Sequence, residues 1–502
     1  MKVLLASSEV VPFAKTGGLA DVCGALPVEL AKREVEVAVF LPAYRSTRDV
    51  GLEFQDTGIE FQIPIGSKMV GGKLLKSQLP NSEVTVYLVQ QDDYFDRDGL
   101  YQDGDEEFKD NCERFAFFCR FIIDSLGQLD WIPDLVHCND WQTGLIPAYL
   151  KTIYADDPRL NQIASLMTIH NLAYQGNFWH WDMLLTGIDW QYFNWRQMEF
   201  YGRLNLLKTG IIFSDAVNTV SPTYAREIQT AAQGCGLENV LQERAADLSG
   251  VLNGIDTNEW NPKTDPHIAA NYDVENWKTE KPKCKAALQS LFGLDVDPVV
   301  PSIGIVGRMA SQKGWSLIIE VMERWLESDI KVQWAILGTG DAAYQTALSQ
   351  INERAPSTVG VRLEFSNELA HKIEAGADIF LMPSQYEPCG LNQQYSMQYG
   401  TVPVVHETGG LADTVVNLDQ ASLADQTANG FSFDQYHSRA LEEALTRAIQ
   451  MYTLPNTWSQ LVENGMNHNW SWSVSAAEYI KLYQSTIKSG QVQRSDPSPS
   501  VG

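Results

Sequence analysis

The sequence of 502 residues predicts an α/β fold in which two doubly wound domains, each built on a parallel sheet, follow one another along the chain. Apolar strand-like runs alternate with helical stretches over residues 1–220, and a second series of the same kind begins near residue 300. Between the two series, residues 253–276 are rich in turn-forming residues. We therefore expect the change of domain in that segment.

The first half begins with a strand over residues 2–7, which is apolar on both faces, as in a parallel sheet covered by helices. A loop with two adjacent glycines follows, and a helical stretch over 19–33 and a strand over 35–41 then complete a βαβ unit. Similar units are predicted at three further places: residues 134–150, 163–170 and 216–220.

The second half repeats this alternation, starting with a buried strand at residues 301–308. The next predicted helix, 314–327, places four apolar side chains on one face: Leu317, Ile318, Val321 and Trp325. The remaining elements are a strand and turn at 332–340, strands at 377–384 and 402–406, and helices at 391–399 and 473–489.

The composition limits the partners of the protein. Acidic residues outnumber basic ones by 63 to 37, which gives a formal net charge of −26. Such a field repels nucleic acid and anionic membranes, so we expect neither as a partner. It also repels a nucleotide diphosphate, so a phosphate site needs a local cluster of Lys, Arg and backbone N–H groups.

Cysteine and histidine usage indicates the compartment and the absence of cofactors. The seven cysteines form no C-x-x-C pair, which favours a reducing, cytoplasmic compartment. The eight histidines form no clustered ligand set, so we expect no structural zinc, and no other cofactor is expected. The first ten residues indicate a strand rather than a signal peptide, and no run of about 18 apolar residues would span a bilayer.

The string KTGGLAD at residues 15–21 is a candidate phosphate site. Lys15 and the N–H groups of Gly17 and Gly18 can hold an anion at the start of a helix. A structural turn with a surface lysine remains the alternative. The string TGGLAD recurs at 408–413, again after a strand and before a helix, so two such turns would face each other across a cleft.

Two further strand ends carry candidate groups. Arg308 and Lys313, in GRMASQKG, suit a diphosphate, although both are alternatively solvated loop cations. Glu387, in SQYEPCGLNQ, suits a sugar hydroxyl beside a group of N–H donors, or it caps a helix. The donors are the backbone N–H groups of Gly390, Leu391 and Asn392, and Cys389 between them is expected to be a packed thiol rather than a nucleophile.

His170 and Asp140 each follow a predicted strand and either bind sugar hydroxyls or have a structural role, which for Asp140 is an N-cap. Aromatic residues gather between residues 174 and 201. Either sugar faces stack on these rings or the rings pack in the core: Trp179, Trp181, Trp190, Tyr192, Trp195 and Tyr201.

Taken together, these strings resemble glycosyltransferase family 5, the bacterial glycogen synthases and the starch synthases, including the granule-bound type. The strings that carry the resemblance are KTGGLADV, TIHNLAYQG, VSPTYAREI, GVLNGID, GRMASQKG, EPCGLNQ and TGGLADTV. The resemblance implies a GT-B fold, with two Rossmann-like domains and an interdomain cleft. It implies retaining transfer of glucose from ADP-glucose to an α-1,4-glucan (maltooligosaccharide, glycogen or starch), with release of ADP and no metal, in the cytoplasm or on glucan granules.

The resemblance also implies an organisation of the chain. The domains would be an N-terminal, acceptor-side domain at 1–262, a C-terminal, nucleotide-sugar-binding domain at 263–468, a last helix at 469–489 that crosses back onto the first domain, and a disordered tail at 490–502.

Site residues follow from the family motifs. The catalytic set would be Lys15, His170, Arg308, Lys313 and Glu387. The nucleotide-sugar would be held by Gly17, Gly18, Asp21, Asp140, Asn253, Phe365 (as an adenine-stacking ring), Cys389, Gly390, Leu391, Asn392, Thr408, Gly409 and Gly410. The acceptor would meet Glu9, Asp21 and Tyr174.

Two positions depart from the family pattern. Gln142 stands where many members carry His, and Tyr395 stands where the wider retaining class often has a second Glu. Two other functions therefore remain open: a retaining transferase with a small acceptor, and a non-catalytic glucan-binding homologue.

Overall fold

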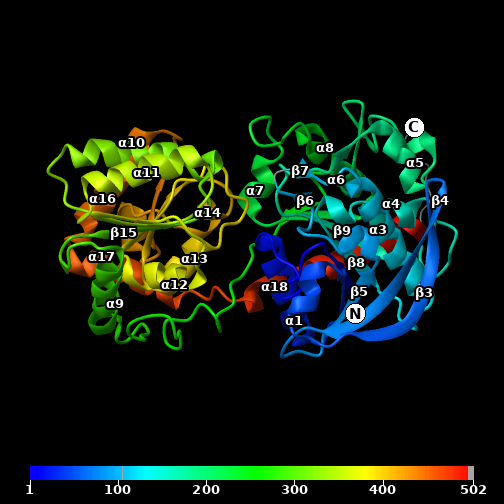
Figure 1. The fold of residues 1–502 in the computed structure, drawn as a ribbon, viewed down its shortest axis with the longest axis horizontal. Helices are drawn as coiled ribbons and strands as arrows, with labels where there is room; N and C mark the ends of the chain where they lie inside the picture. The colour runs from blue at the N-terminus through cyan, green and yellow to red at the C-terminus, as the bar shows by residue number, and fades with distance from the viewer. Residues whose placement is uncertain (105, 496–502) are drawn as a thin grey trace. The chain divides into compact units, whose positions relative to one another are not determined.

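The computed structural model describes residues 1–104 and 106–495. The chain forms two compact units (Figure 1). The N-terminal unit contains residues 1–220, 225–251 and the chain from Trp472 onward, and the C-terminal unit contains residues 221–224 and 252–471. The chain thus passes between the units near the positions that the sequence analysis gave as 262 and 468.

The N-terminal unit is built on a nine-stranded sheet in the order β14-β13-β9-β8-β1-β2-β5-β4-β3. Its strands are β1 (Lys2–Ala6), β2 (Glu36–Pro42), β3 (Gln55–Ile65), β4 (Lys68–Gln78), β5 (Thr85–Gln90), β8 (Leu135–Asn139), β9 (Ala164–Ile169), β13 (Ala216–Thr219) and β14 (Leu248–Gly250). All pairings are parallel except β4 with β5 and β3 with β4. This antiparallel hairpin was not predicted from the sequence.

The remaining elements of this unit cover the sheet or form loops. The helices are α1 (Gly18–Ala31), α2 (Asp92–Phe95), α3 (Asn111–Leu126), α4 (Leu145–Lys151), α5 (Met183–Thr186), α6 (Leu206–Phe213), α8 (Glu238–Glu243) and α18 (Trp472–Ser495), while α7 (Pro222–Glu227) lies where the chain passes between the units. Short 3-10 helices are η1 (Arg45–Asp49), η2 (Trp141–Thr143), η3 (His180–Asp182) and η4 (Trp190–Tyr192). Small strands are β6 (Gln102–Asp103), β7 (Glu106–Glu107), β10 (Asn177–Phe178), β11 (Glu199–Phe200) and β12 (Arg203–Asn205).

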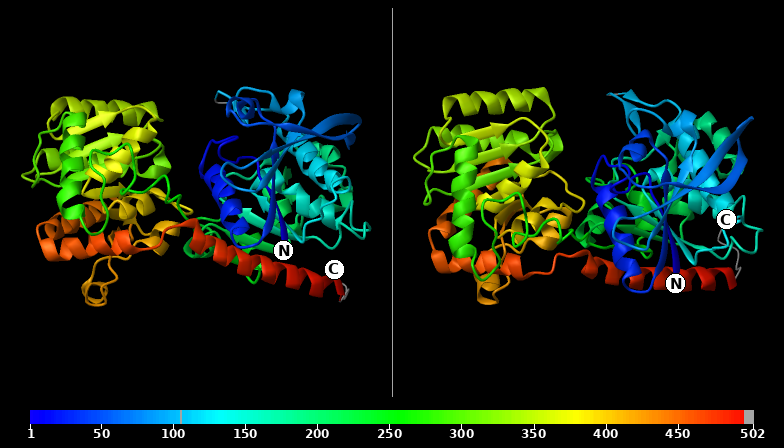
Figure 2. Two further views of the ribbon diagram at one scale, coloured as in Figure 1. Left: turned by 90° about the horizontal axis from the view of Figure 1, so that it is seen from below. Right: turned by 60° about the horizontal axis from the view of Figure 1, so that its bottom comes forward.

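The last helix, α18, packs on the N-terminal unit beside α1 (Figure 2). Its Tyr483 hydroxyl lies 2.9 Å from Nδ1 of the buried His137 on β8, and Tyr479 accepts a hydrogen bond from Asn218. The helix runs to Ser495, so the prediction of a disordered tail from residue 490 is wrong for residues 490–495. The rest of that predicted tail, 496–502, lies outside the described residues.

The C-terminal unit has a six-stranded, fully parallel sheet in the order β17-β16-β15-β18-β19-β20. Its strands are β15 (Ser302–Val306), β16 (Gln333–Leu337), β17 (Val359–Arg362), β18 (Ile379–Met382), β19 (Val402–His406) and β20 (Phe431–Phe433). Its helical elements are α9 (Trp277–Phe292), η5 (Ser311–Lys313), α10 (Trp315–Leu326), α11 (Ala342–Arg354), α12 (Asn367–Gly376), α13 (Asn392–Gln398), α14 (Gly409–Thr414), α15 (Gln420–Ala424), α16 (Ser438–Tyr452) and α17 (Pro455–Asn467).

Helices cover both faces of this sheet, which explains why its strands are apolar throughout. Two apolar clusters result: helices α10, α11, α16 and α17 contribute to the first, and α9, α12 and α13 contribute to the second. The face of α10 predicted from the sequence is confirmed, since Leu317, Ile318, Val321 and Trp325 are buried. In the part of the chain that the structure describes, no helix is both long and apolar enough to cross a membrane.

Candidate active site

The KTGG loop of the N-terminal unit is held by Glu9, which lies beyond the carboxyl end of β1. The Glu9 carboxylate is 4% exposed. It accepts hydrogen bonds from the backbone N–H groups of Thr16 (2.5 Å) and Gly17 (3.1 Å) and from the Thr16 hydroxyl (2.6 Å). The sequence predicted that the Gly17 N–H holds a phosphate and that Glu9 meets the acceptor. The structure instead pairs these two groups with each other.

Lys15 extends from the same loop toward solvent. Its Nζ lies 2.7 Å from Asp21 Oδ1, and the two side chains are 53% and 31% exposed. An ion pair this exposed contributes little to stability, so Lys15 remains available to an anionic ligand. Helix α1 begins at Gly18, one residue before the predicted start at residue 19.

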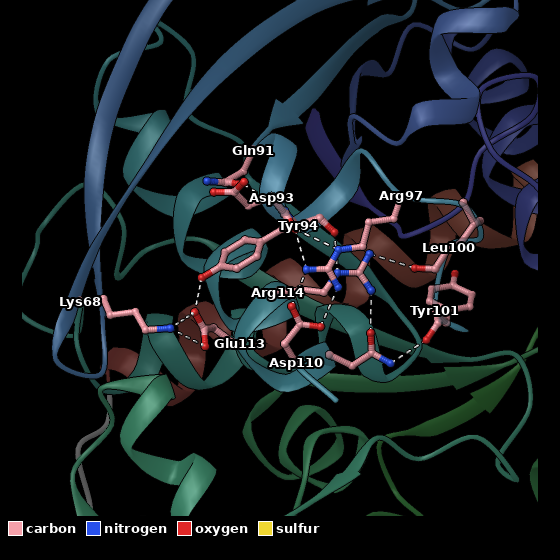
Figure 3. A network of polar contacts seen from close by, with 11 residues as sticks. Lys68, Gln91, Asp93, Tyr94, Arg97, Leu100, Tyr101, Asp110, Glu113 and Arg114 are labelled. Atoms are coloured by element: carbon pink, nitrogen blue, oxygen red, sulfur yellow. Dashed lines mark hydrogen bonds and ion pairs between the residues drawn. The ribbon is translucent and has the colours of Figure 1, made fainter. Parts of the chain in front are cut away.

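Glu9 also contacts Tyr101, which belongs to a polar network with Arg114 (Figure 3 shows Tyr101 and Arg114). The Tyr101 hydroxyl lies 2.8 Å from Glu9 Oε1 and 2.7 Å from Ser8 Oγ, and it donates to the carboxylate, which can only accept. The Tyr101 carbonyl accepts from the Asn111 amide, whose oxygen accepts from the guanidinium of the fully buried Arg114 at 2.6 Å. Tyr101, Asn111 and Arg114 belong to no motif, so sequence reasoning missed them.

Arg114 is a buried cation that is satisfied by neutral oxygen atoms. Besides Asn111, its guanidinium donates to the carbonyls of Tyr94 (2.7 Å) and Leu100 (3.0 Å). Because both carbonyls belong to the chain that leads to Tyr101, Arg114 fixes the backbone on which Tyr101 stands (Figure 3).

Asp140 and His170 follow neighbouring strands of the sheet, β8 and β9, and contact each other. The backbone N–H of His170 donates to Asp140 Oδ1 at 2.8 Å. Asp140 has a φ of +55°, a conformation that residues other than glycine rarely adopt and that is often found at functional sites. Burial raises the pKa of Asp140 to about 7, and the nearby Glu9 carboxylate raises it further while the hydrogen bond from His170 opposes the shift.

The tautomer of His170 is set by Asn139. The imidazole Nε2 lies 2.8 Å from the amide oxygen of Asn139, and the amide nitrogen of Asn139 donates to the Ala6 carbonyl at 3.0 Å. The amide oxygen only accepts, so Nε2 carries the proton and Nδ1 is an acceptor. Burial lowers the pKa of His170 to about 3, which keeps the ring neutral near pH 7. Such a ring can orient a hydroxyl group but does not carry a positive charge.

The two departures from the family pattern have structural explanations. The Gln142 side chain lies in the interior, with its Oε1 buried, so this position does not present a proton-transferring group at the sheet edge. Tyr395 stacks face to face on Trp260, with ring centroids 3.9 Å apart and planes inclined by 10°. Its ring therefore fills an aromatic stack where the wider class has a carboxylate.

In the C-terminal unit, Lys313 and Glu387 form an ion pair beyond the carboxyl ends of β15 and β18. Lys313 Nζ lies 2.6 Å from Glu387 Oε2, and the Ser384 hydroxyl donates to the same oxygen at 2.9 Å. The Glu387 side chain is 11% exposed and that of Lys313 is 28% exposed. The alternative in which Glu387 caps a helix is not observed, because α13 has no side-chain cap.

Arg308 precedes this pair and is exposed. Its carbonyl accepts from the Trp315 indole N–H at 3.0 Å, which fixes the backbone of the loop. Within the described residues, no carboxylate forms an ion pair with its guanidinium. The sheet edge therefore presents one cation paired with Glu387 and a second cation without a carboxylate partner.

The second copy of TGG, residues 408–410, packs against the loop that carries Glu387. The Gly410 N–H donates to the carbonyls of Glu387 and Pro388, both at 3.1 Å. A Cβ on Gly409 would lie 2.0 Å from the Glu387 oxygen, and a Cβ on Gly410 would lie 2.0 Å from the Cys389 oxygen. The Gly410 N–H therefore already has protein carbonyls as acceptors, and its contact with a nucleotide-sugar stays a prediction.

The predicted N–H cradle lies beside these glycines. Gly390 has a φ of +68°, which turns the chain into α13, and the Asn392 side chain donates to the Val306 carbonyl at 2.9 Å. Burial raises the pKa of the Cys389 thiol to about 12, opposed in part by a hydrogen bond from the Asn253 backbone. Cys389 is thus a packed thiol, as predicted, and Asn253 lies next to it.

The remaining predicted contacts differ in exposure. Phe365, on the loop between β17 and α12, is 92% exposed, and Tyr174 is 55% exposed. Thr408 precedes α14 and is buried. The tryptophans at 179, 181, 190 and 195 are exposed rather than packed in a core.

Comparison with known proteins gives the family. The model of the starch synthase catalytic domain matches residues 2–243, and the model of glycosyl transferases group 1 matches residues 297–468. The glycogen synthase of Rhodopirellula baltica is 45% identical over 99% of this chain and 100% of its own length. That of Thermotoga maritima is 43% identical over 97% and 99%.

The chain belongs to the family of glycogen and starch synthases. Among solved structures, the catalytic domain of starch synthase IV from Arabidopsis thaliana, bound to ADP and acarbose, aligns with a TM-score of 0.87 and 32% identity over 97% of this chain and 99% of that one. A sucrose-phosphate synthase from Thermosynechococcus elongatus shares the fold at a TM-score of 0.57 and 16% identity.

The GT-B fold expected from the sequence is therefore confirmed. The protein is a glycosyltransferase that elongates a glucan, as the family resemblance implied. Neither the small-acceptor transferase nor the non-catalytic homologue is favoured by these relatives.

Proposed function

We propose that this enzyme transfers glucose from ADP-glucose to the end of an α-1,4-glucan with retention of configuration, and that Arg308, Lys313 and Glu387 form its donor site. The Lys313–Glu387 ion pair of 2.6 Å, placed next to the exposed Arg308, carries this proposal. Two cations at one sheet edge can neutralise a diphosphate, and the carboxylate can accept hydrogen bonds from glucose hydroxyls. The related starch synthase IV structure contains ADP, which favours an adenine nucleotide.

Charge develops on the diphosphate as the bond to glucose breaks. Arg308 and Lys313 stabilise that charge in the transition state, a preorganised electrostatic effect that in this proposal requires no metal ion. The acceptor 4-hydroxyl approaches on the side of the leaving group, and a phosphate oxygen takes its proton. His170 is neutral and accepts at Nδ1, so its role in the proposal is to orient a sugar hydroxyl.

The test is incorporation of labelled glucose into glycogen from ADP-glucose and from UDP-glucose, with and without EDTA. We expect ADP-glucose to be preferred and EDTA to have no effect. Arg308→Ala and Lys313→Ala should each lower kcat by about 10²-fold, the usual cost of removing one stabilising donor.

Lys283→Ala is the matched control, because Lys283 also pairs with a glutamate, Glu280, at 2.7 Å, but on the exposed surface of α9. It should leave kcat unchanged. A Lys313→Ala enzyme with the wild-type kcat, or equal use of both donors, would refute the proposal.

A further inference from the structure

A continuous strip of exposed tryptophans lies on the N-terminal unit between β10 and α6. Trp179, Trp181 and Trp190 are 59%, 49% and 39% exposed. The ring centroids of Trp179 and Trp181 are 6.4 Å apart, and those of Trp181 and Trp190 are 5.4 Å apart. We call these three residues the tryptophan strip. Contiguous exposed apolar surface of this kind marks an interaction site, whereas apolar side chains that are exposed singly are common.

The backbone beneath the strip is fixed by local hydrogen bonds and by buried anchors. Trp179 and Trp181 flank the start of η3, where the Asp182 N–H donates to the Trp179 carbonyl at 2.9 Å. Trp190 begins η4, which the Asp189 side chain caps by accepting from the Gln191 N–H at 2.8 Å. Between these turns, Met183, Thr186 and Ile188 are buried. The strip is thus preorganised, and a ligand does not have to order it.

The chemistry of the strip fits a sugar polymer. One face of a pyranose ring presents C–H groups that stack on an indole, while its rim presents hydroxyls for polar neighbours. Asp189 and Gln191 are exposed beside the rings and can bond such hydroxyls. The net charge of −26 disfavours nucleic acid and anionic lipid, which also use aromatic contacts, and it does not oppose a neutral sugar polymer.

The geometry favours a bent chain over a flat one. The planes of Trp179 and Trp181 are inclined by 65°, and those of Trp181 and Trp190 by 74°. Successive rings therefore face different directions, as successive glucose units do in an α-1,4-glucan. This is also the polymer that the enzyme elongates.

A residue next to the strip packs beside the turn that contains Asp140. Phe178, which precedes Trp179, contacts Trp141 with ring centroids 5.5 Å apart, and Trp141 follows Asp140. Phe178 and Trp141 therefore connect the strip to the turn at Asp140. The three tryptophans of the strip do not belong to that turn.

We propose that the tryptophan strip is a second glucan-binding surface, which holds one part of an α-1,4-glucan while another part is elongated. The proposal rests on the elongating function of the enzyme. Holding the polymer at a second point raises the effective concentration of its chain ends near the active site. A polymeric primer gains from this effect, whereas a maltotriose molecule is too short to bridge two sites.

Two measurements test the strip. The first is migration of the protein in native gels that contain glycogen, which needs no donor sugar. The second is KM for glycogen and for maltotriose in the transfer reaction. The Trp179→Ala/Trp181→Ala/Trp190→Ala enzyme should bind glycogen at least about tenfold more weakly, as loss of aromatic hot spots does, and KM for glycogen should rise to a similar extent. The kcat and KM with maltotriose should not change.

The matched control is Trp195→Ala, because Trp195 is 68% exposed and its ring lies 5.2 Å from the Arg196 guanidinium carbon, outside the strip. It should behave like wild type, and Trp181→Phe, which keeps a stacking ring, should retain most of the binding that Trp181→Ala loses. If the triple variant unfolds, the comparison of Trp181→Ala with Trp181→Phe still tests the proposal.

Unchanged glycogen migration in the Trp→Ala variants would overturn the proposal. So would variants that change only the oligomeric state in sedimentation, because the strip would then be a contact between copies of this chain. If wild-type enzyme migrates with glycogen but transfers nothing from ADP-glucose, the donor assignment fails and the strip does not.

Discussion

The two copies of TGG predict opposite responses to the same substitution. At Gly409, an added Cβ would lie 2.0 Å from the Glu387 carbonyl oxygen and 2.9 Å from its carbon, and φ is +46°. At Gly17 and Gly18, an added Cβ would meet nothing within 4 Å. Gly409→Ala should therefore disturb the fold, whereas Gly17→Ala and Gly18→Ala should not.

The cost at Gly409 has two parts. A left-handed conformation costs a residue with a Cβ about 1–2 kcal/mol. Separating the Cβ from a backbone carbonyl requires a shift of more than about 1 Å, and overpacking of this kind typically costs about 1–3 kcal/mol. We expect a loss of about 3 kcal/mol, which corresponds to a fall in Tm of roughly 10 °C for a unit of this size. Because the loop that moves carries Glu387, kcat should fall as well.

Thermal unfolding and initial rates with ADP-glucose and glycogen measure both effects. Gly17→Ala serves as the control for Tm, and it should remain within about 1 °C of wild type because it creates no contact. A Gly409→Ala enzyme with the wild-type Tm and kcat would refute this reasoning. A Gly17→Ala enzyme that is equally destabilised would refute it too.

Three further predictions concern the N-terminal unit. Glu9→Ala removes the acceptor of four hydrogen bonds that hold the KTGG loop and Tyr101, so kcat/KM should fall by about tenfold or more. Tyr101→Phe removes only one of these bonds and should lower kcat/KM less. Equal losses of kcat/KM in the two variants would contradict the network. Burial raises the pKa of Asp140 from 3.8 to about 7. Between these two pH values the folded protein keeps the Asp140 proton and the unfolded chain loses it. The free energy of unfolding of wild type should therefore fall as the pH rises from about 4 to 7. Asp140→Asn should therefore gain stability relative to wild type across that window in urea unfolding, and a difference that does not vary with pH would exclude the raised pKa. Asn139→Asp places a carboxylate against Nε2 of His170 and should raise the pKa of the histidine from about 3. The kcat–pH profile of this variant should then have an acidic limb, which the wild-type profile lacks. Identical profiles would show that Asn139 does not set the protonation of His170.

Much of the fold followed from the sequence, because hydrophobic periodicity is a local property. The βαβ units and the buried face of α10 were predicted for this reason. The β3–β4 hairpin was missed although β3 carries apolar residues at alternate positions, from Ile59 to Ile65. Such alternation is typical of a strand with one exposed face, whereas the predicted units were recognised by runs that are apolar on both faces. The extension of α18 to Ser495 was missed because its last turns lack an apolar pattern.

The donor-site residues were also within reach of the sequence. Lys313 and Glu387 are 74 positions apart, yet each follows a predicted strand of one parallel sheet. The carboxyl ends of parallel strands lie at one edge of a sheet, which is why the two side chains come together. Family motifs then indicated which of the residues at that edge carry function.

Only the tertiary structure decided which backbone groups remain available and which side chains are exposed. The string TGGLAD is identical in both copies, but Glu9 accepts from the Gly17 N–H in one, and the Glu387 and Pro388 carbonyls accept from the Gly410 N–H in the other. The sequence likewise could not separate a packed tryptophan from an exposed one. Hydrogen-bond partners and burial depend on residues that are distant in the chain, and no local pattern records them.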